Sequence, residues 1–156
     1  MNSIFDLFKI SIGPSSSHTV GPMSATKKFC ENLDENGLLV SIGKIKIELF
    51  GSLAYTGKAH GTDKALIIGL LGYTPLTVDT SKIMDIVKSV QKENAINIIG
   101  KKEIPFNADK DIIYNTSDKP GFHSNAMIFT AIDINGEIIS SHSYYSIGGG
   151  TILSEN

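Results

Sequence analysis

The sequence predicts an α+β domain with a mixed or antiparallel sheet that helices cover on one face. Two observations carry this prediction. Helix-type periodicity and capping residues fill the first two thirds of the chain, whereas apolar runs rich in β-branched and aromatic residues dominate the last third. The expected order is therefore helix, strand, helices and then several strands that include a hairpin. At 156 residues, the chain is long enough for one domain with a substantial core.

The strands are predicted from alternation and from one turn signal. Residues 44–50 alternate strictly between polar and apolar side chains, which is typical of a half-buried strand. Asn135-Gly136 separates two apolar runs and favours a type I′ hairpin turn, because that turn needs positive φ at both of its central positions. Strands are expected at 44–50, 126–134 and 137–147, with weaker ones at 96–99 and 112–114.

The helices are predicted from spacing and from their end signals. Pro22 fits only the first turn of a helix, so one helix is expected from there to near Gly37. A second is expected from Thr62 or Asp63 to Leu71, and its apolar composition predicts that it is mostly buried. A third covers residues 83–90, which have apolar side chains at helical spacing behind the capping candidates Asp79, Thr80 and Ser81.

Composition excludes several classes of function. The net charge is −2 and all 14 basic residues are Lys, so the planar Arg side chains that read guanine and phosphate are missing and nucleic acid is an unexpected partner. A single cysteine, Cys30, excludes an intramolecular disulfide and a CxxC metal clamp. The longest apolar run, residues 65–72, is too short to span a membrane, and the first ten residues lack a basic leader. The simplest expectation is a cytoplasmic protein.

The first segment that could carry chemistry is 13–22, which runs into a predicted helix. The unpaired N–H groups and positive dipole end at a helix start favour anions such as a carboxylate. The alternative is that these residues only cap the helix and form turns. The candidates are Ser15, Ser16, Ser17, His18 and Thr19.

The second segment is 51–64, which follows the clearest strand and opens the most buried helix. Gly57 and Gly61 would let the backbone approach a ligand closely, while Lys58 supplies a cation and His60 a titratable base. A Walker A loop is excluded, because no Gly-Lys-Ser/Thr ends the run at the required spacing. The alternative is a glycine-rich turn with an exposed histidine.

The third segment is the polar group His123-Ser124-Asn125, just before the hairpin, whose alternative interpretation is a solvated loop. A zinc site is disfavoured, because no two histidines have the short spacing of zinc ligands. Cys30 lies on an apolar helix face and is expected to pack in the core.

These segments together resemble the iron–sulfur-dependent bacterial L-serine dehydratases (L-serine ammonia-lyases), in their N-terminal or β portion. The matching segments follow one another in order across nearly the whole chain: 5–8, 13–23, 51–65, 123–125 and 144–150. Tyr55 and Ala59 depart from the pattern, where an aliphatic residue and a glycine are expected. The resemblance implies a fold similar to the allosteric substrate-binding domain of certain phosphoglycerate dehydrogenases.

The resemblance also implies the reaction, in which L-serine loses water and the aminoacrylate that results rearranges and hydrolyses to pyruvate and ammonia. In this family an iron of a [4Fe–4S] cluster acts on the serine hydroxyl, and the cysteines of an α part hold that cluster. One cysteine cannot hold a cluster, so the cluster is expected outside this chain and no metal ligand is assigned within it. This would be one half of an enzyme of amino-acid catabolism.

Roles within the chain follow from this resemblance as expectations. A base active near pH 7 must remove the α-proton of serine, and His60 is assigned that role, with His18 as its rival. Ser15, Ser16, Ser17 and Thr19 are expected to hold the substrate carboxylate, and His18 to orient. The remaining substrate-binding candidates are Lys58, Gly61, Thr62, Asp63, His123, Ser124 and Asn125.

The three glycines 148–150 are interpreted as a hinge. Residues 1–150 then form the β domain, and residues 151–156 begin a linker to an absent, cysteine-rich α domain or subunit. The expected partners are L-serine, that α part and further copies of the chain in a homo-oligomer. The alternative function is a non-catalytic module that senses serine.

Overall fold

The computed structural model describes residues 17–117, 125–148 and 150–155. A five-stranded mixed sheet dominates it, with the strand order β4-β1-β5-β6-β7. Only the β1–β4 pair is parallel, and the other neighbours are antiparallel. The strands are β1 (Ile42–Phe50), β4 (Ile112–Asn115), β5 (Ala126–Asp133), β6 (Ile138–Gly148) and β7 (Thr151–Glu155).

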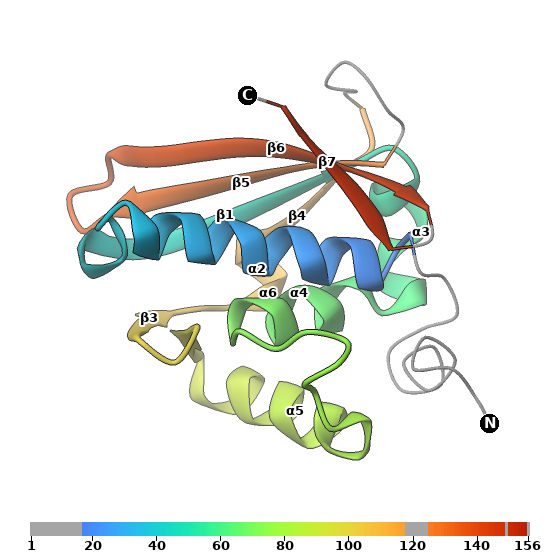
Figure 1. Ribbon diagram of the computed structural model, residues 1–156, viewed down its shortest axis with the longest axis horizontal. Helices are drawn as coiled ribbons and strands as arrows, with labels where there is room; N and C mark the ends of the chain where they lie inside the picture. The colour runs from blue at the N-terminus through green and yellow to red at the C-terminus, as the bar shows by residue number, and fades with distance from the viewer. Residues whose placement is uncertain (1–16, 118–124, 149, 156) are drawn as a thin grey trace.

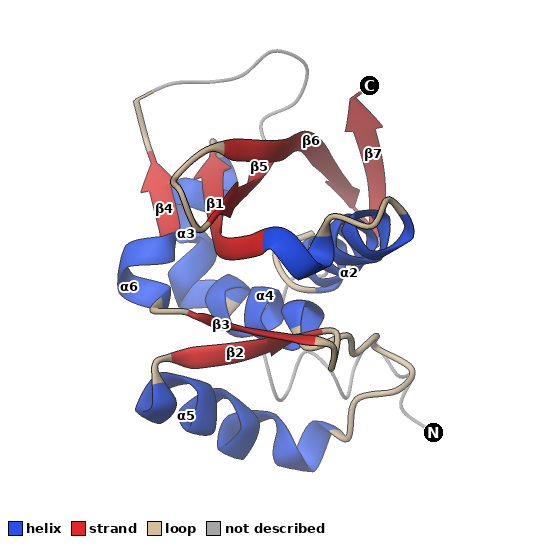
Figure 2. Ribbon diagram, turned by 90° about the vertical axis from the view of Figure 1, so that its left-hand side faces the viewer, coloured by secondary structure: helices blue, strands red, loops and turns tan. Residues whose placement is uncertain are grey.

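Helices pack beneath this sheet, and a second, smaller layer lies farther down (Figures 1 and 2). α2 (Val20–Glu35) runs under β5, β6 and β7 and packs along α4 (Thr62–Leu70), while α3 (Ser52–His60) contacts β1 and β4. Below α4 lie a two-stranded sheet and α5; these elements are β2 (Ala95–Ile98), β3 (Lys102–Pro105) and α5 (Ile83–Glu93). The short α6 (Ala108–Asp111) leads into β4, and 3₁₀ turns lie at Leu39–Ser41 and Thr80–Lys82.

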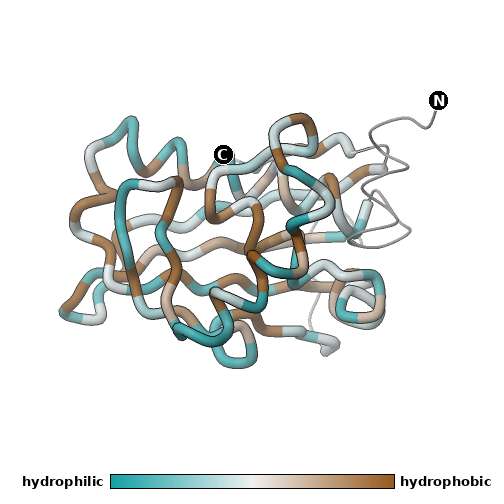
Figure 3. Tube along the Cα trace, turned by 90° about the horizontal axis from the view of Figure 1, so that it is seen from below, coloured by the Kyte–Doolittle hydropathy of each residue, from teal (hydrophilic) through white to brown (hydrophobic). Residues whose placement is uncertain are grey.

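The core lies between the sheet and the helices. Strand alternation turns Ile45, Ile47 and Leu49 of β1 inward, where Phe29 of α2 meets Phe129 of β5 at a ring distance of 5.4 Å. Hydropathy changes repeatedly along the trace, so that apolar stretches stay short (Figure 3). No helix in the described part of the chain has the length and apolar character needed to cross a membrane.

The predicted fold class is confirmed, and so are the five predicted strands and the three predicted helices, with ends that differ by a few residues. The hairpin lies where it was expected, between β5 and β6, and Gly136 has positive φ. The predicted type I′ turn is wrong, because Asn135 does not have the positive φ that this turn needs. Three elements between residues 50 and 112 were not predicted. Residues 52–60 form α3, where the sequence suggested a glycine-rich turn, residues 102–105 form β3, and residues 108–111 form α6.

Strand β7 directly follows the hinge predicted at residues 148–150. Residues 151–155 pair antiparallel with β6 and extend the sheet, where the sequence suggested the start of a linker. Gly148 and Gly150 both have positive φ, which suits the tight reversal between the two strands. The domain boundary after residue 150 stays a prediction.

Candidate active site

Residues 17–22 of the first segment meet the second segment at one end of the sheet, where the start of α2 approaches α3 (Figure 1). The turn at residues 17–19 leads directly into α2 and places His18 beside α3. His60 is the last residue of α3, and its ring centroid lies 4.7 Å from that of His18. The structure thus brings together two histidines that are 42 positions apart in the sequence.

His18 is buried, with 7% of its surface exposed, and both of its ring nitrogens contact hydroxyl groups. Nδ1 lies 2.9 Å from Ser17 Oγ. Nε2 lies 3.0 Å from Ser52 Oγ and 3.1 Å from Thr56 Oγ1. Burial lowers the pKa of His18, the neighbouring His60 lowers it further, and a hydrogen bond to the backbone of Ser52 opposes both effects. His18 is therefore a neutral imidazole at physiological pH.

His60 has a different environment from His18. Its side chain is half-buried, and its Nδ1 is buried without a hydrogen-bond partner among the described residues. A buried polar atom without a hydrogen bond destabilises the fold unless a ligand or water supplies that bond. His60 therefore has a buried ring nitrogen that no described group satisfies, whereas both ring nitrogens of His18 contact hydroxyls.

The short connection between α3 and α4 links the segments that contain the two histidines. Gly61 has φ +80°, a left-handed conformation that ends α3 and starts α4 with no intervening loop. The next residue, Thr62, is fully buried and donates its hydroxyl hydrogen to the backbone carbonyl of His18. A Cβ at Gly57 would lie 3.2 Å from Thr62 Oγ1, so the glycine in the middle of α3 allows α4 to approach this closely.

A second polar pair lies next to this junction. Asp63 Oδ1 and the Tyr114 hydroxyl are buried, and neither has a hydrogen-bond partner among the described residues. Burial raises the pKa of Tyr114, and the carboxylates of Asp63 and Asp109 add to that effect. Tyr114 is thus a neutral phenol that faces an acidic side chain at the start of α4.

The hairpin contributes to the same end of the sheet. The hydroxyl of Ser146, a fully buried residue of β6, donates to the backbone carbonyl of Ser17 over 2.7 Å. The Ser146 backbone N–H donates to the carbonyl of Asn125 over 3.0 Å. A Cβ at Gly21 would collide with the Ser146 hydroxyl, so α2 reaches β6 this closely only with glycine at that position. The third predicted segment is therefore connected to the first through Ser146.

The predicted site residues thus fall into three groups. The structure gathers Ser17, His18, His60 and Thr62, with Gly61 and Asp63 beside them and Asn125 connected through Ser146. Thr19 is buried at the start of α2, whereas Lys58 lies exposed on α3. Four candidates lie outside the described residues: Ser15, Ser16, His123 and Ser124.

Sequence reasoning missed Ser52, Thr56, Tyr114 and Ser146. Ser52 and Thr56 are four positions apart, which places them on one face of a helix. The glycines in residues 51–64 obscure that signal, because they also favour a turn between the strand and the next helix. Tyr114 and Ser146 lie on strands, and nothing in the sequence indicates which side chains they meet.

Residues for a metal centre are missing from the described part of the chain. No three His, Cys, Asp or Glu side chains gather there in a way that could hold a metal ion. Cys30 is fully buried in α2 against the sheet, and burial raises its pKa to about 12, so that it stays a thiol near pH 7. The donor set of this chain therefore does not fit an iron–sulfur cluster, whose ligands are several thiolates.

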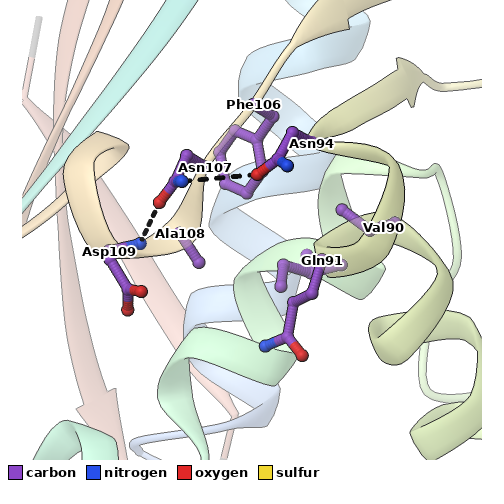
Figure 4. A pocket seen from close by; sticks show the side chains of 8 residues that line it. Val90, Gln91, Asn94, Phe106, Asn107, Ala108 and Asp109 are labelled. Atoms are coloured by element: carbon purple, nitrogen blue, oxygen red, sulfur yellow. Dashed lines mark hydrogen bonds between the residues drawn. The ribbon is translucent and has the colours of Figure 1, made fainter.

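A pocket of about 330 Å³ lies away from the histidines, between the C-terminal end of α5 and the start of α6 (Figure 4). Its polar groups mostly satisfy one another. Asn107 Oδ1 accepts from the backbone of Asp109 over 2.9 Å, and Asn107 Nδ2 donates to Asn94 Oδ1 over 3.3 Å. The pocket is lined by none of the predicted site residues, and it does not carry a functional assignment.

Comparison with known proteins places this geometry in a family. The family model described as "Serine dehydratase beta chain" matches residues 3–156. The L-serine dehydratase of Streptomyces coelicolor is 42% identical over 154 residues, which cover 99% of this chain and 34% of that protein. L-serine dehydratase 1 of Escherichia coli is 44% identical over 156 residues, which cover 99% of this chain and 34% of that protein. The L-serine dehydratase of Helicobacter pylori is 38% identical over 154 residues, which cover 98% of this chain and 33% of that protein. The chain therefore spans about a third of the length of these curated relatives.

Proposed function

This chain belongs to the family of serine dehydratase beta chains, and we propose that it forms the β part of an enzyme that converts L-serine to pyruvate and ammonia. The observation that carries the proposal is the contact between two imidazoles, 4.7 Å apart, amid hydroxyls of the segments that match the family. The complete enzyme would add a cysteine-rich α part. Removal of water from serine needs a base for a weakly acidic α-proton and help for a poor leaving group, hydroxide.

We assign the base to His60. Its buried Nδ1 has no partner in the described structure, whereas His18 uses both ring nitrogens in contacts with Ser17, Ser52 and Thr56. Imidazole is the side chain best suited to act as a general base near neutral pH. In this assignment His18 orients and His60 acts on the substrate.

The substrate carboxylate is assigned to the segment before α2. The hydroxyls of Ser15, Ser16 and Thr19 and the N–H groups at the start of the helix would provide donors for an anion, whereas the Ser17 hydroxyl contacts His18 Nδ1. Lys58 supplies a cation on α3, and Asp63 supplies a carboxylate that suits the ammonium group of an amino acid. Gly61, Thr62 and the group His123, Ser124 and Asn125 would shape the remaining wall.

The [4Fe–4S] cluster of the complete enzyme is assigned to the α part, because the donors of this chain do not fit it. The steps proposed for this chain are binding, orientation and movement of the α-proton. A cytoplasmic location and a homo-oligomeric state stay predictions from the sequence.

The second candidate is a module that senses serine without catalysing its breakdown. A polar site at one end of the sheet would serve binding as well, but a sensor has no need for an imidazole whose Nδ1 lacks a partner among the described residues. Calorimetric titration of the chain alone with L-serine distinguishes the two. We expect no saturable binding, because half of the site belongs to the α part. Tight, saturable binding by the chain alone would instead identify a sensor.

A further inference from the structure

Two hydroxyls of α3 contact the same ring nitrogen of His18. Ser52 and Thr56 are one helical turn apart, and their side-chain oxygens lie 3.0 Å and 3.1 Å from His18 Nε2. Neither residue was among the predicted site residues. Their contacts determine which ring nitrogen of His18 carries the proton.

The hydrogen of the Thr56 hydroxyl already has an acceptor. Thr56 Oγ1 lies 2.9 Å from the backbone carbonyl oxygen of Ser52, and a carbonyl oxygen can only accept. A hydroxyl has a single hydrogen, so Thr56 presents a lone pair to His18 Nε2. The ring must therefore donate at Nε2, and in a neutral imidazole Nδ1 then becomes the acceptor, which receives the hydroxyl hydrogen of Ser17 over 2.9 Å.

This arrangement matters for the neighbouring ring. His18 and His60 are 4.7 Å apart, and a positive charge on His18 would oppose the arrival of a proton on His60. The partners of His18 hold it in place on both sides, through Ser17 at Nδ1, the two α3 hydroxyls at Nε2, and Thr62 at the backbone carbonyl. The lowered pKa of His18 agrees with a ring that stays neutral while His60 takes up the proton.

We propose that Thr56, assisted by Ser52, is a positioning residue that fixes His18 as the Nε2-protonated neutral imidazole and holds its ring against His60. The proposal deepens the function proposed above and rests on it for its catalytic consequence. The tautomer itself is a property of the folded chain that can be measured without any substrate.

Two variants at position 56 test the proposal. Thr56→Val removes the hydroxyl at nearly constant volume, and Thr56→Ser keeps it. In the complete enzyme we expect Thr56→Val to lower kcat by roughly tenfold to 100-fold with KM changed less than about threefold, because misplaced catalytic groups cost rate more than binding. Thr56→Ser should restore most of the rate. Tyr55→Phe is the matched control on the same helix, since its hydroxyl donates to the Thr116 carbonyl, away from His18.

Nitrogen-15 NMR of the His18 ring provides the second measurement. We expect a protonated Nε2 and an unprotonated Nδ1 in the wild-type chain, and a mixture of tautomers in Thr56→Val. A wild-type ring protonated at Nδ1, or Thr56→Val with an unchanged kcat, would overturn the proposal. Should the complete wild-type enzyme release no pyruvate while NMR gives the expected tautomers, the positioning role would hold and the proposed function would fail.

Discussion

Replacing His60 with alanine is expected to lower kcat for pyruvate formation by the complete enzyme by about 10²-fold to 10⁴-fold, the range that a positioned general base contributes. KM for L-serine should change far less, because the substrate carboxylate is assigned to the segment before α2. The reason lies in the contrast between the two imidazoles. His60 has a buried nitrogen without a partner among the residues that the structure describes, whereas hydroxyls contact both nitrogens of His18. Steady-state kinetics of pyruvate release measure both parameters.

Two histidine variants serve as comparisons. His18→Ala should lower kcat less than His60→Ala, because an orienting group is removed and the base remains. His142→Gln is the matched control, since His142 lies on β6 with its ring 5.9 Å from that of Phe29, away from the candidate site. Wild-type rates in His60→Ala, together with a severe loss in His18→Ala, would reverse the assignment of the base.

Replacing Gly69 with alanine is expected to destabilise the fold by about 1–2 kcal/mol. The residue lies in α4 against α2, and a Cβ there would lie 2.8 Å from the Met23 backbone oxygen and 2.9 Å from Thr26 Cβ. Alanine in a helix is favoured over glycine by up to about 1 kcal/mol. Overpacking a core costs about 1–3 kcal/mol, and here one of the opposing atoms belongs to the backbone and cannot rotate away, so we expect the unfavourable effect to exceed the favourable one.

The same substitution should also change the geometry of the candidate active site. α2 begins two residues after His18 and α4 begins two residues after His60, so a change in helix spacing displaces the two rings relative to each other. At roughly 2–4 °C per kcal/mol for a domain of this size, Tm should fall by several degrees, and Gly69→Val should lower it further. Ser89→Ala on the exposed face of α5 is the control and should stay within about 0.5 kcal/mol of wild type. An unchanged or raised Tm for Gly69→Ala would contradict the close helix contact.

Much of the fold could be predicted from the sequence, because β1, the β5–β6 hairpin and α5 show their periodicity directly. α3 could not be predicted, because glycines at 51, 57 and 61 suggested a loop. The structure gives each of these glycines a place that permits a helix: Gly51 and Gly61 lie at its two ends with positive φ, and Gly57 lies where Thr62 and Tyr114 come close. The prediction gave too much weight to glycine content and too little to tertiary packing.

Only part of the candidate site could be predicted, because its contacts also depend on tertiary packing. The segments that contain His18 and His60 could be found from residue types, but their contact depends on α2, α3 and α4 packing at one end of the sheet. Ser52 and Thr56 share a helix face only once residues 52–60 are known to be helical. Ser146 is brought to Ser17 by pairing of β6 within the sheet, a long-range contact that local pattern does not encode.

The most direct test of the central claim is anaerobic measurement of pyruvate release from L-serine, with this chain alone and with a cluster-loaded, cysteine-rich α partner. We predict pyruvate only from the combined sample, because the proposal assigns the base and the carboxylate site to this chain and the cluster ligands to the α part. Absence of pyruvate from an assembled complex with an intact cluster would contradict the account and would leave serine sensing as the function of this chain.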